Sequence, residues 1–261
     1  MSEPLRGGNS NQVMREGDTV VRQTGPWSPF VQHVLRHLAD HGFAASPVLI
    51  ETTEHTERLT FLKGEVGNDP LKPYMQSPTI LIEAAQLLRR LHDITQQVIV
   101  PDDAVFMLPV PPDQPREVIC HNDFAPYNCV FREGHLVGII DFDTAGPGSR
   151  LWDIAYAVYR FVPLMNDDHC RDAGWESIPD RVARLRLFCE AYGLDDRMAR
   201  AALVDTVIAR LAALIAYMRE TGLAPEHIPI YEQDIDYMRA QQGIFTAGLL
   251  ADAAGCESMP E

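Results

Sequence analysis

Apolar and polar residues alternate in short runs over the first sixty residues, the pattern of β-strands with one buried face. Two such runs, 12–15 and 19–23, flank the turn sequence Glu16-Gly17-Asp18 and predict a β-hairpin. A third run, 58–62, predicts the last strand of the same sheet, and residues 63–67 after it predict a flexible connector.

Helical spacing of apolar residues first appears between Ser28-Pro29, a helix-start sequence, and Gly42, a stop signal. From about Asn68 onward, helical patterns dominate to the end of the chain. One predicted helix there begins at Ser77-Pro78. Further predicted helices cover 181–192, 196–219 and 231–245. The pattern predicts an α+β fold of two lobes, a small β-rich N-lobe with its hinge over 1–67 and a larger, mostly helical C-lobe over 68–261.

The candidate catalytic and metal-binding side chains are concentrated in residues 120–143. His121, Asp123 and Asn128 have the H-x-D-x-x-x-x-N spacing of a kinase catalytic loop. Such a loop pairs a carboxylate that accepts the proton of a substrate hydroxyl with an amide oxygen that binds metal. Each residue alone would be read as a turn former that bonds its own backbone, but their joint spacing favours a functional site.

Two short apolar runs follow, 130–132 and 136–140, with Glu133-Gly134 as a turn between them. Pairing of these strands would bring Asn128 and Asp141 to the same end of a hairpin. One carboxylate and one amide are enough protein ligands for Mg²⁺, which keeps waters and phosphate oxygens in its shell. The sequence therefore predicts a magnesium site at this end.

The stretch resembles the catalytic loop and metal-binding hairpin of the aminoglycoside phosphotransferase and choline kinase-like family, which has the protein-kinase fold. The usual H-G-D-x-x-x-x-N appears here with Asn122 in place of glycine, and the following I-D-[FW] appears as 140–142. LLRRLHD at 87–93 and GPGSRLWDIA at 146–155 are similar to the segments before the loop and after the metal aspartate.

This resemblance implies a two-lobed, protein-kinase-like phosphotransferase that uses ATP (or GTP) and Mg²⁺. It implies a small-molecule acceptor with a hydroxyl, such as an aminoglycoside or an amino alcohol. Asp123 is the expected base, and the adenine edge would be read by the backbone at Phe61 and Leu62. The expected metal ligands are Asn128, Asp141 and, for a second ion, Asp143. His121 and Asp153 are expected to brace the loop by hydrogen bonds.

The N-lobe departs from the wider fold in two ways. Arg22 stands where a phosphate-binding lysine is usual, and the helix from Pro29 to His41 has no glutamate to pair with it. Arg22 could still bind phosphate through its planar fork, or be a solvated strand charge. The Gly7-Gly8 loop could cover the phosphates. These departures leave open a pseudokinase that binds nucleotide without turnover, while a two-metal hydrolase lacks its usual histidine ligands.

Charge and composition exclude other classes. The 261 residues carry 22 basic and 37 acidic side chains, a net charge of −15 that would repel nucleic acid. Five cysteines without a C-x-x-C pair fit reduced thiols. Without an apparent targeting segment or a membrane-length apolar run, we expect a cytoplasmic protein. The sequence predicts no oligomeric state, and its candidate acceptor-binding residues, among them Asp167, Asp168, Glu190 and Asp205, are equally consistent with surface charges.

Overall fold

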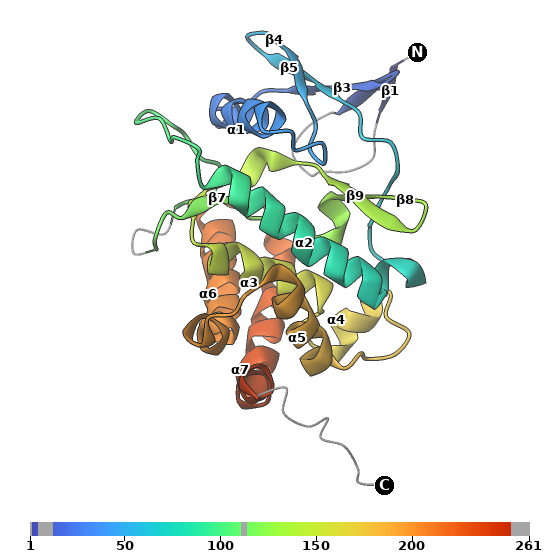
Figure 1. The fold of residues 1–261 in the computed structure, drawn as a ribbon, viewed down its shortest axis with the longest axis vertical. Coiled ribbons are helices and arrows are strands. Elements are labelled where there is room, and N and C mark those ends of the chain that lie inside the picture. Colours follow the sequence, from blue (N-terminus) through green and yellow to red (C-terminus); the bar gives the residue numbers. More distant parts are fainter. Residues whose placement is uncertain (1, 5–12, 111–113, 252–261) are drawn as a thin grey trace, which may run out of the picture.

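The computed structural model describes residues 2–4, 13–110 and 114–251, so the Gly7-Gly8 loop lies outside the described residues. The protein has two lobes, a small antiparallel sheet with one helix and a larger, mostly helical part (Figure 1). This is the fold class that the sequence predicts.

The N-lobe sheet has the strand order β1-β2-β3-β5-β4, with every neighbouring pair antiparallel. Its strands are β1 (Ser2–Pro4), β2 (Met14–Glu16), β3 (Thr19–Gln23), β4 (Leu49–Thr52) and β5 (Thr56–Thr60). The predicted hairpin is β2 and β3. The sequence did not indicate β4, whose residues are mostly exposed and lack the alternation that marks a half-buried strand.

Helix α1 (Ser28–Asp40) packs its apolar face into the core through Phe30, Val31, Val34, Leu35 and Leu38. The helix begins one residue earlier than predicted, so Ser28 does not cap it. Instead, the Ser28 hydroxyl accepts a hydrogen bond from the backbone N–H of Gly25 at 2.9 Å.

The chain crosses between the lobes over residues 61–67, and part of this crossing is a strand. β6 (Glu65–Val66) pairs antiparallel with β8 (Cys129–Arg132). Just before it, Gly64 has φ +156°, and a Cβ there would lie 2.5 Å from the carbonyl oxygen of Phe131. The expectation of a flexible connector is therefore wrong for its second half, which is hydrogen-bonded to β8.

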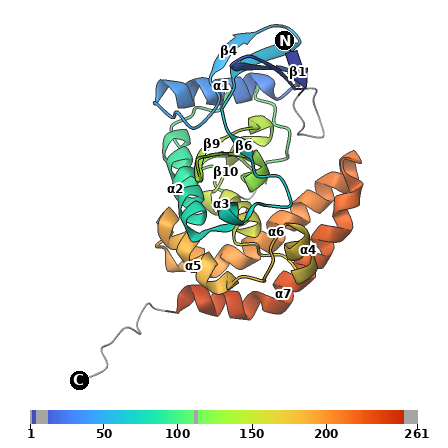
Figure 2. The same cartoon turned by 90° about the vertical axis from the view of Figure 1, so that its right-hand side faces the viewer.

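The remaining strands belong to the C-lobe: β7 (Val118–Cys120), β9 (His135–Ile139), which completes the hairpin with β8, and β10 (Gly146–Gly148), which pairs with β7. Its helices are α2 (Pro78–Thr95), α3 (Arg150–Phe161), α4 (Asp167–Asp172), α5 (Arg181–Tyr192), α6 (Arg197–Thr221) and α7 (Ile228–Leu250). In the side view, α2 lies at the left of the lobe, and α7 runs along its bottom beneath α5 and α6 (Figure 2), both of which it contacts. Ser77 caps α2 as predicted, accepting from the N–H of Ile80.

Helix α6 is long and apolar enough to span a membrane by length and composition alone, which the sequence reading did not anticipate. It packs against α3 and α7 and buries one face, including Leu203, Val207 and Leu211. These contacts are those of a core helix in a globular domain.

Candidate active site

The loop between β7 and β8 holds the catalytic motif. Asn122 has φ +64°, in the left-handed region that glycine adopts most readily and asparagine tolerates best among other residues. This conformation explains how Asn122 can occupy the usual glycine position. Its side chain also donates to the carbonyl oxygen of Thr144 at 3.0 Å.

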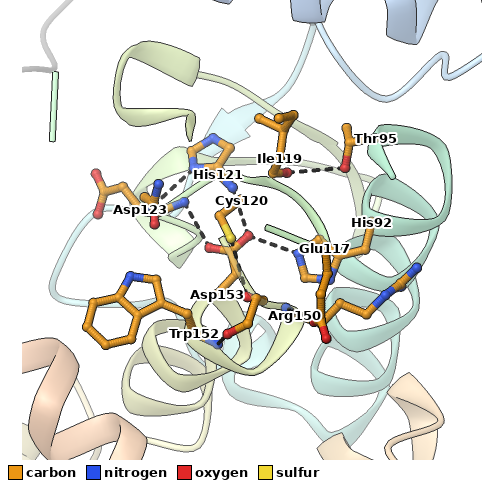
Figure 3. Close-up of polar contacts among 12 residues, drawn as sticks. His92, Thr95, Glu117, Ile119, Cys120, His121, Asp123, Arg150, Trp152 and Asp153 are labelled. Carbon is orange, nitrogen blue, oxygen red and sulfur yellow. Dashed lines mark hydrogen bonds and ion pairs between the residues drawn. The ribbon is translucent and has the colours of Figure 1, made fainter. Parts of the chain in front are cut away.

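A buried carboxylate fixes the start of this loop. Asp153, in the first turn of α3, is fully buried and accepts hydrogen bonds from the backbone N–H of His121 (2.7 Å) and of Asn122 (2.8 Å). His92 of α2 lies 3.0 Å from the same carboxylate through Nε2 (Figure 3). Burial alone would raise the pKa of Asp153, but the hydrogen bond and charge of His92 and the contact with His121 lower it overall.

The candidate base Asp123 is held through both carboxylate oxygens. The phenol of Tyr127 donates to Oδ1 at 2.5 Å, and Nδ2 of Asn128 donates to Oδ2 at 2.8 Å. With its amide nitrogen turned toward Asp123, Asn128 keeps its amide oxygen for another ligand. Burial raises the pKa of Asp123, while the Tyr127 hydrogen bond opposes that rise.

The hairpin forms as the sequence predicts. Cys129 pairs with Ile139, and the N–H of Ile140 donates to the carbonyl oxygen of Asn128 at 2.9 Å. Asn128 and Asp141 therefore flank the paired strands at the same end. Asp141 has φ +61°, so the chain turns sharply as it leaves the hairpin.

The candidate metal ligands offer only oxygen donors, the type that Mg²⁺ requires. The side chain of Asp141 is 41% exposed and that of Asp143 is 13% exposed. Burial and the neighbouring Asp141 carboxylate raise the pKa of Asp143 to about 6, against the opposing charge of Arg22. Within the described residues, no group of three or more His, Cys, Asp or Glu side chains is placed to hold a metal, and the candidate set itself has two carboxylates and one amide. The residues fit an ion that takes most of its ligands from water and nucleotide.

Arg22 of β3 connects the N-lobe to these carboxylates. Its guanidinium is buried and lies 2.7 Å from Glu57, 2.8 Å from Asp143 and 3.5 Å from Asp141. Burial lowers the pKa of Arg22, but the combined charge of the three carboxylates raises it by more. The pKa of Arg22 therefore lies above its usual value. Arg22 is thus not a solvated strand charge.

Glu57 is the acid that the sequence reading found missing. It lies on β5 directly opposite Arg22 instead of on α1, and α1 reaches it through Gln32, whose amide donates to Glu57 at 2.9 Å. Its signal in the sequence was a glutamate on the same face of a strand as buried Leu59.

Phe61 and Leu62 follow β5 where the chain leaves the N-lobe. The N–H of Phe61 donates to the carbonyl oxygen of Asp18 at 2.9 Å, and the guanidinium of Arg15 lies 4.0 Å from the centre of its ring. Leu62 packs against β9 at Gly138. Reading of an adenine edge by these two residues stays a prediction.

Two further residues beside Asp123, Tyr127 and Arg210, were not predicted from the sequence as parts of the site. Tyr127 occupies a variable position inside the motif, where nothing marks it as a partner of the base. Arg210 of α6 donates from Nη2 to the carbonyl oxygen of Asn122 at 2.6 Å. Its signal was an arginine on the same helical face as buried Leu203 and Val207.

Comparison with known proteins adds the following. Residues 104–188 match the phosphotransferase enzyme family. The chain is 34% identical over 209 residues to the trifolitoxin immunity protein of Rhizobium leguminosarum bv. trifolii, covering 78% of each sequence. In structure it is similar to an amicoumacin kinase solved with AMP-PNP, Ca²⁺ and amicoumacin, with a TM-score of 0.66, 13% identity and coverage of 92% and 88%. It is also similar to an ethanolamine kinase of Plasmodium vivax, with a TM-score of 0.64, 14% identity and coverage of 95% and 83%.

The two solved kinases share the fold at low identity, and the curated relative shares sequence over most of both chains. The family match spans the catalytic loop, the hairpin and α3. The protein belongs to the phosphotransferase enzyme family.

Proposed function

We propose that the protein transfers the γ-phosphate of ATP or GTP to a hydroxyl of a small molecule. The observation that carries this proposal is the pair of hydrogen bonds that holds Asp123 between Tyr127 and Asn128. This arrangement fixes a carboxylate for proton transfer next to an amide that is oriented for a metal. The AMP-PNP bound in the amicoumacin kinase favours ATP as the donor.

In the proposed reaction, Asp123 accepts the proton of the acceptor hydroxyl as the acceptor oxygen bonds to the γ-phosphorus. The bond from that phosphorus to the β–γ bridging oxygen breaks, and its electron pair leaves with the nucleoside diphosphate. Little covalent chemistry falls to the protein, so fixed positions of its charges provide most of the rate enhancement. Asp153 contributes by holding the backbone that carries Asp123.

Asn128, Asp141 and Asp143 would hold Mg²⁺, which when bound neutralises the charge of the transferring phosphate groups. Arg22 adds a fixed positive charge beside the two carboxylates. We place this activity in the cytoplasm, where ATP is abundant and thiols stay reduced.

One of the two arguments for a pseudokinase is weakened by the structure. It relied on the absence of a glutamate to orient Arg22, and Glu57 supplies that carboxylate from the neighbouring strand. The substitution of arginine for lysine remains, but it preserves the positive charge.

The test is nucleotide consumption by purified protein with Mg-ATP, offered amino sugars, amino alcohols, macrolides and hydroxy acids as acceptors. We expect at least one acceptor to stimulate ADP release. Asp123→Asn should lower kcat by roughly 10²–10⁴-fold with little change in nucleotide affinity, because the amide cannot accept the proton. A variant that keeps most of its kcat would remove Asp123 from the role of base, and Mg-ATP binding without stimulation by any acceptor would favour the pseudokinase.

A further inference from the structure

Arg210 is a buried arginine whose positive charge acts on the Asp123 carboxylate without forming an ion pair with it. Its side chain belongs to the core-facing side of α6, and the residue is 3% exposed. Nε is buried with no hydrogen-bond partner, and the one hydrogen bond the guanidinium makes to a described residue is from Nη2 to Asn122. Within the described ranges, no carboxylate lies at ion-pair distance from it. The charge of Asp123 offsets part of the cost of burying this guanidinium, but its remaining N–H groups lack acceptors among the described residues, which favours a further hydrogen-bonding partner.

Two aromatic rings contact the guanidinium of Arg210 without neutralising its charge. Its guanidinium carbon lies 5.4 Å from the centre of the Trp152 ring and 5.2 Å from that of Tyr156. Such ring contacts favour a cation, and they leave its charge intact. The Asn122 carbonyl ties the guanidinium to the residue before Asp123, so this charge lies beside the catalytic loop.

The groups around the base form a chain of phenols. Tyr127 donates to Asp123, its oxygen lies 2.8 Å from that of Tyr156, and Tyr156 is 3.5 Å from the hydroxyl of Tyr231 on α7. A second guanidinium, that of Arg160, lies 5.2 Å from the centre of the Tyr127 ring. Unlike Arg210, Arg160 is paired with a carboxylate, that of Asp69, at 2.8 Å.

The acidic side chains nearby are already engaged. Asp153 accepts hydrogen bonds from two backbone N–H groups of the catalytic loop. Asp234 is hydrogen-bonded to the side chains of Tyr159, Asn166 and His169. Three of the four acidic residues that the sequence offered for binding a cationic acceptor have polar partners: Asp167 pairs with Arg181, Asp168 pairs with Arg171, and Asp205 accepts from Gln242. The fourth, Glu190, is exposed on α5. A polycation would meet phenols and guanidinium groups near Asp123 instead of free carboxylates.

We propose that the acceptor is a hydroxylated molecule carrying an anionic group, and that Arg210 binds this group while the hydroxyl faces Asp123. This inference rests on the proposed phosphotransferase function and names the acceptor class. Arg210 would form charge-assisted hydrogen bonds with a carboxylate or phosphate, and the tyrosines would contact an aromatic or apolar body. The acceptor would then be unlike an aminoglycoside or a simple amino alcohol, whose amines are repelled by an unpaired arginine.

Matched compounds test the charge preference in the wild-type protein. The first set is 4-(hydroxymethyl)benzoate, its primary amide and the corresponding benzylamine, which share a ring and a hydroxyl and differ in charge. The second set is glycerol 3-phosphate and glycerol. Binding is measured by calorimetry with Mg-ADP present, and turnover by ADP release from Mg-ATP. We expect the anionic member of at least one set to bind about tenfold or more tightly than its neutral counterpart, and the benzylamine to bind most weakly.

Variants then assign the preference to Arg210. Arg210→Met keeps the length and apolar stem, and should reduce the preference for the anion by about 10- to 100-fold, mainly through KM. Arg210→Lys should restore part of it. Arg239→Met is the matched control, because Arg239 is an exposed helix arginine on α7 and should leave the ratio unchanged.

The outcomes separate the two proposals. Tighter binding of the neutral or cationic members, no binding of either anion, or an anion preference that survives in Arg210→Met would overturn the role of Arg210. Turnover of the benzylamine in preference to the acid would also overturn the role of Arg210, but it would support the phosphotransferase function. Anion binding that depends on Arg210 without ADP release would support the anion site and contradict the phosphotransferase function. The set that binds more tightly decides between carboxylate and phosphate.

Discussion

Replacement of Asp153 by asparagine changes one carboxylate oxygen into an amide NH₂ group while keeping the shape of the side chain. In the native protein, that carboxylate accepts from two backbone N–H groups and lies beside His92 (Figure 3). The amide has only one oxygen, so at least one of these donors must face an NH₂ group. The site is fully buried, so water cannot compensate.

The magnitude follows from the bonds that are lost. A hydrogen bond to a charged group contributes about 1.5–3 kcal/mol, and a buried donor left without an acceptor costs about 1–3 kcal/mol more. Asp153→Asn should therefore lower the free energy of unfolding by about 2–5 kcal/mol. At about 2–4 °C per kcal/mol for a domain of this size, Tm should fall by roughly 5–15 °C.

Urea unfolding at pH 7, followed by circular dichroism, measures the difference. Asp168→Asn serves as the control, since it removes an exposed ion pair with Arg171 and should change stability little. The pKa of Asp153 is lowered in the folded state, so its stabilisation is present at neutral pH and is lost as the pH falls through that lowered value. The gap between wild type and Asp153→Asn should narrow in acid. Equal urea midpoints at pH 7 would refute the bracing role of Asp153.

Three other substitutions test the site. Tyr127→Phe removes a hydrogen bond that opposes the burial-induced rise in the pKa of Asp123, so kcat/KM should fall about 10- to 100-fold at acidic pH and less at alkaline pH; an unshifted pH profile would contradict this. Arg22→Ala should weaken Mg-ATP binding by about 1.5–3 kcal/mol and adenosine binding little, with Arg22→Lys restoring part of the loss; equal affinities for Mg-ATP would exclude a phosphate contact. Asp141→Ala should abolish Mg²⁺-dependent nucleotide binding in calorimetry, and unaltered binding would mean that the metal site is elsewhere.

Local features of the site could be predicted from the sequence because their partners are close in the chain. The hairpin brings Asn128 and Asp141 together through a turn of two residues, Glu133 and Gly134, and strand alternation is enough to reveal it. Helix α5 has the bounds that were predicted for it, and it ends at Gly193, whose left-handed conformation (φ +78°) stops the helix.

Long-range contacts could not be predicted in the same way. Glu57 pairs with Arg22 across 35 residues, and the pairing depends on the register of β3 and β5, which no local pattern specifies. Arg210 reaches the catalytic loop across 88 residues because α6 packs on α3. Both residues could be noticed as charges on apolar faces, but their partners follow only from the tertiary arrangement.

The pairing of β6 with β8 determines which parts of the protein can move together. Because β6 is hydrogen-bonded to the hairpin, the end of the interlobe crossing travels with Asn128 and Asp141 instead of with the N-lobe sheet. Gly64, which has no room for a side chain against β8, marks the boundary of this unit. The N-lobe touches the same unit through Leu62, which packs at Gly138. A rotation of the N-lobe relative to this unit would therefore change the distances from Arg22 to Asp141 and Asp143, and it would also strain the hydrogen bond from the N–H of Ile139 to the carbonyl oxygen of Ala45 (2.7 Å).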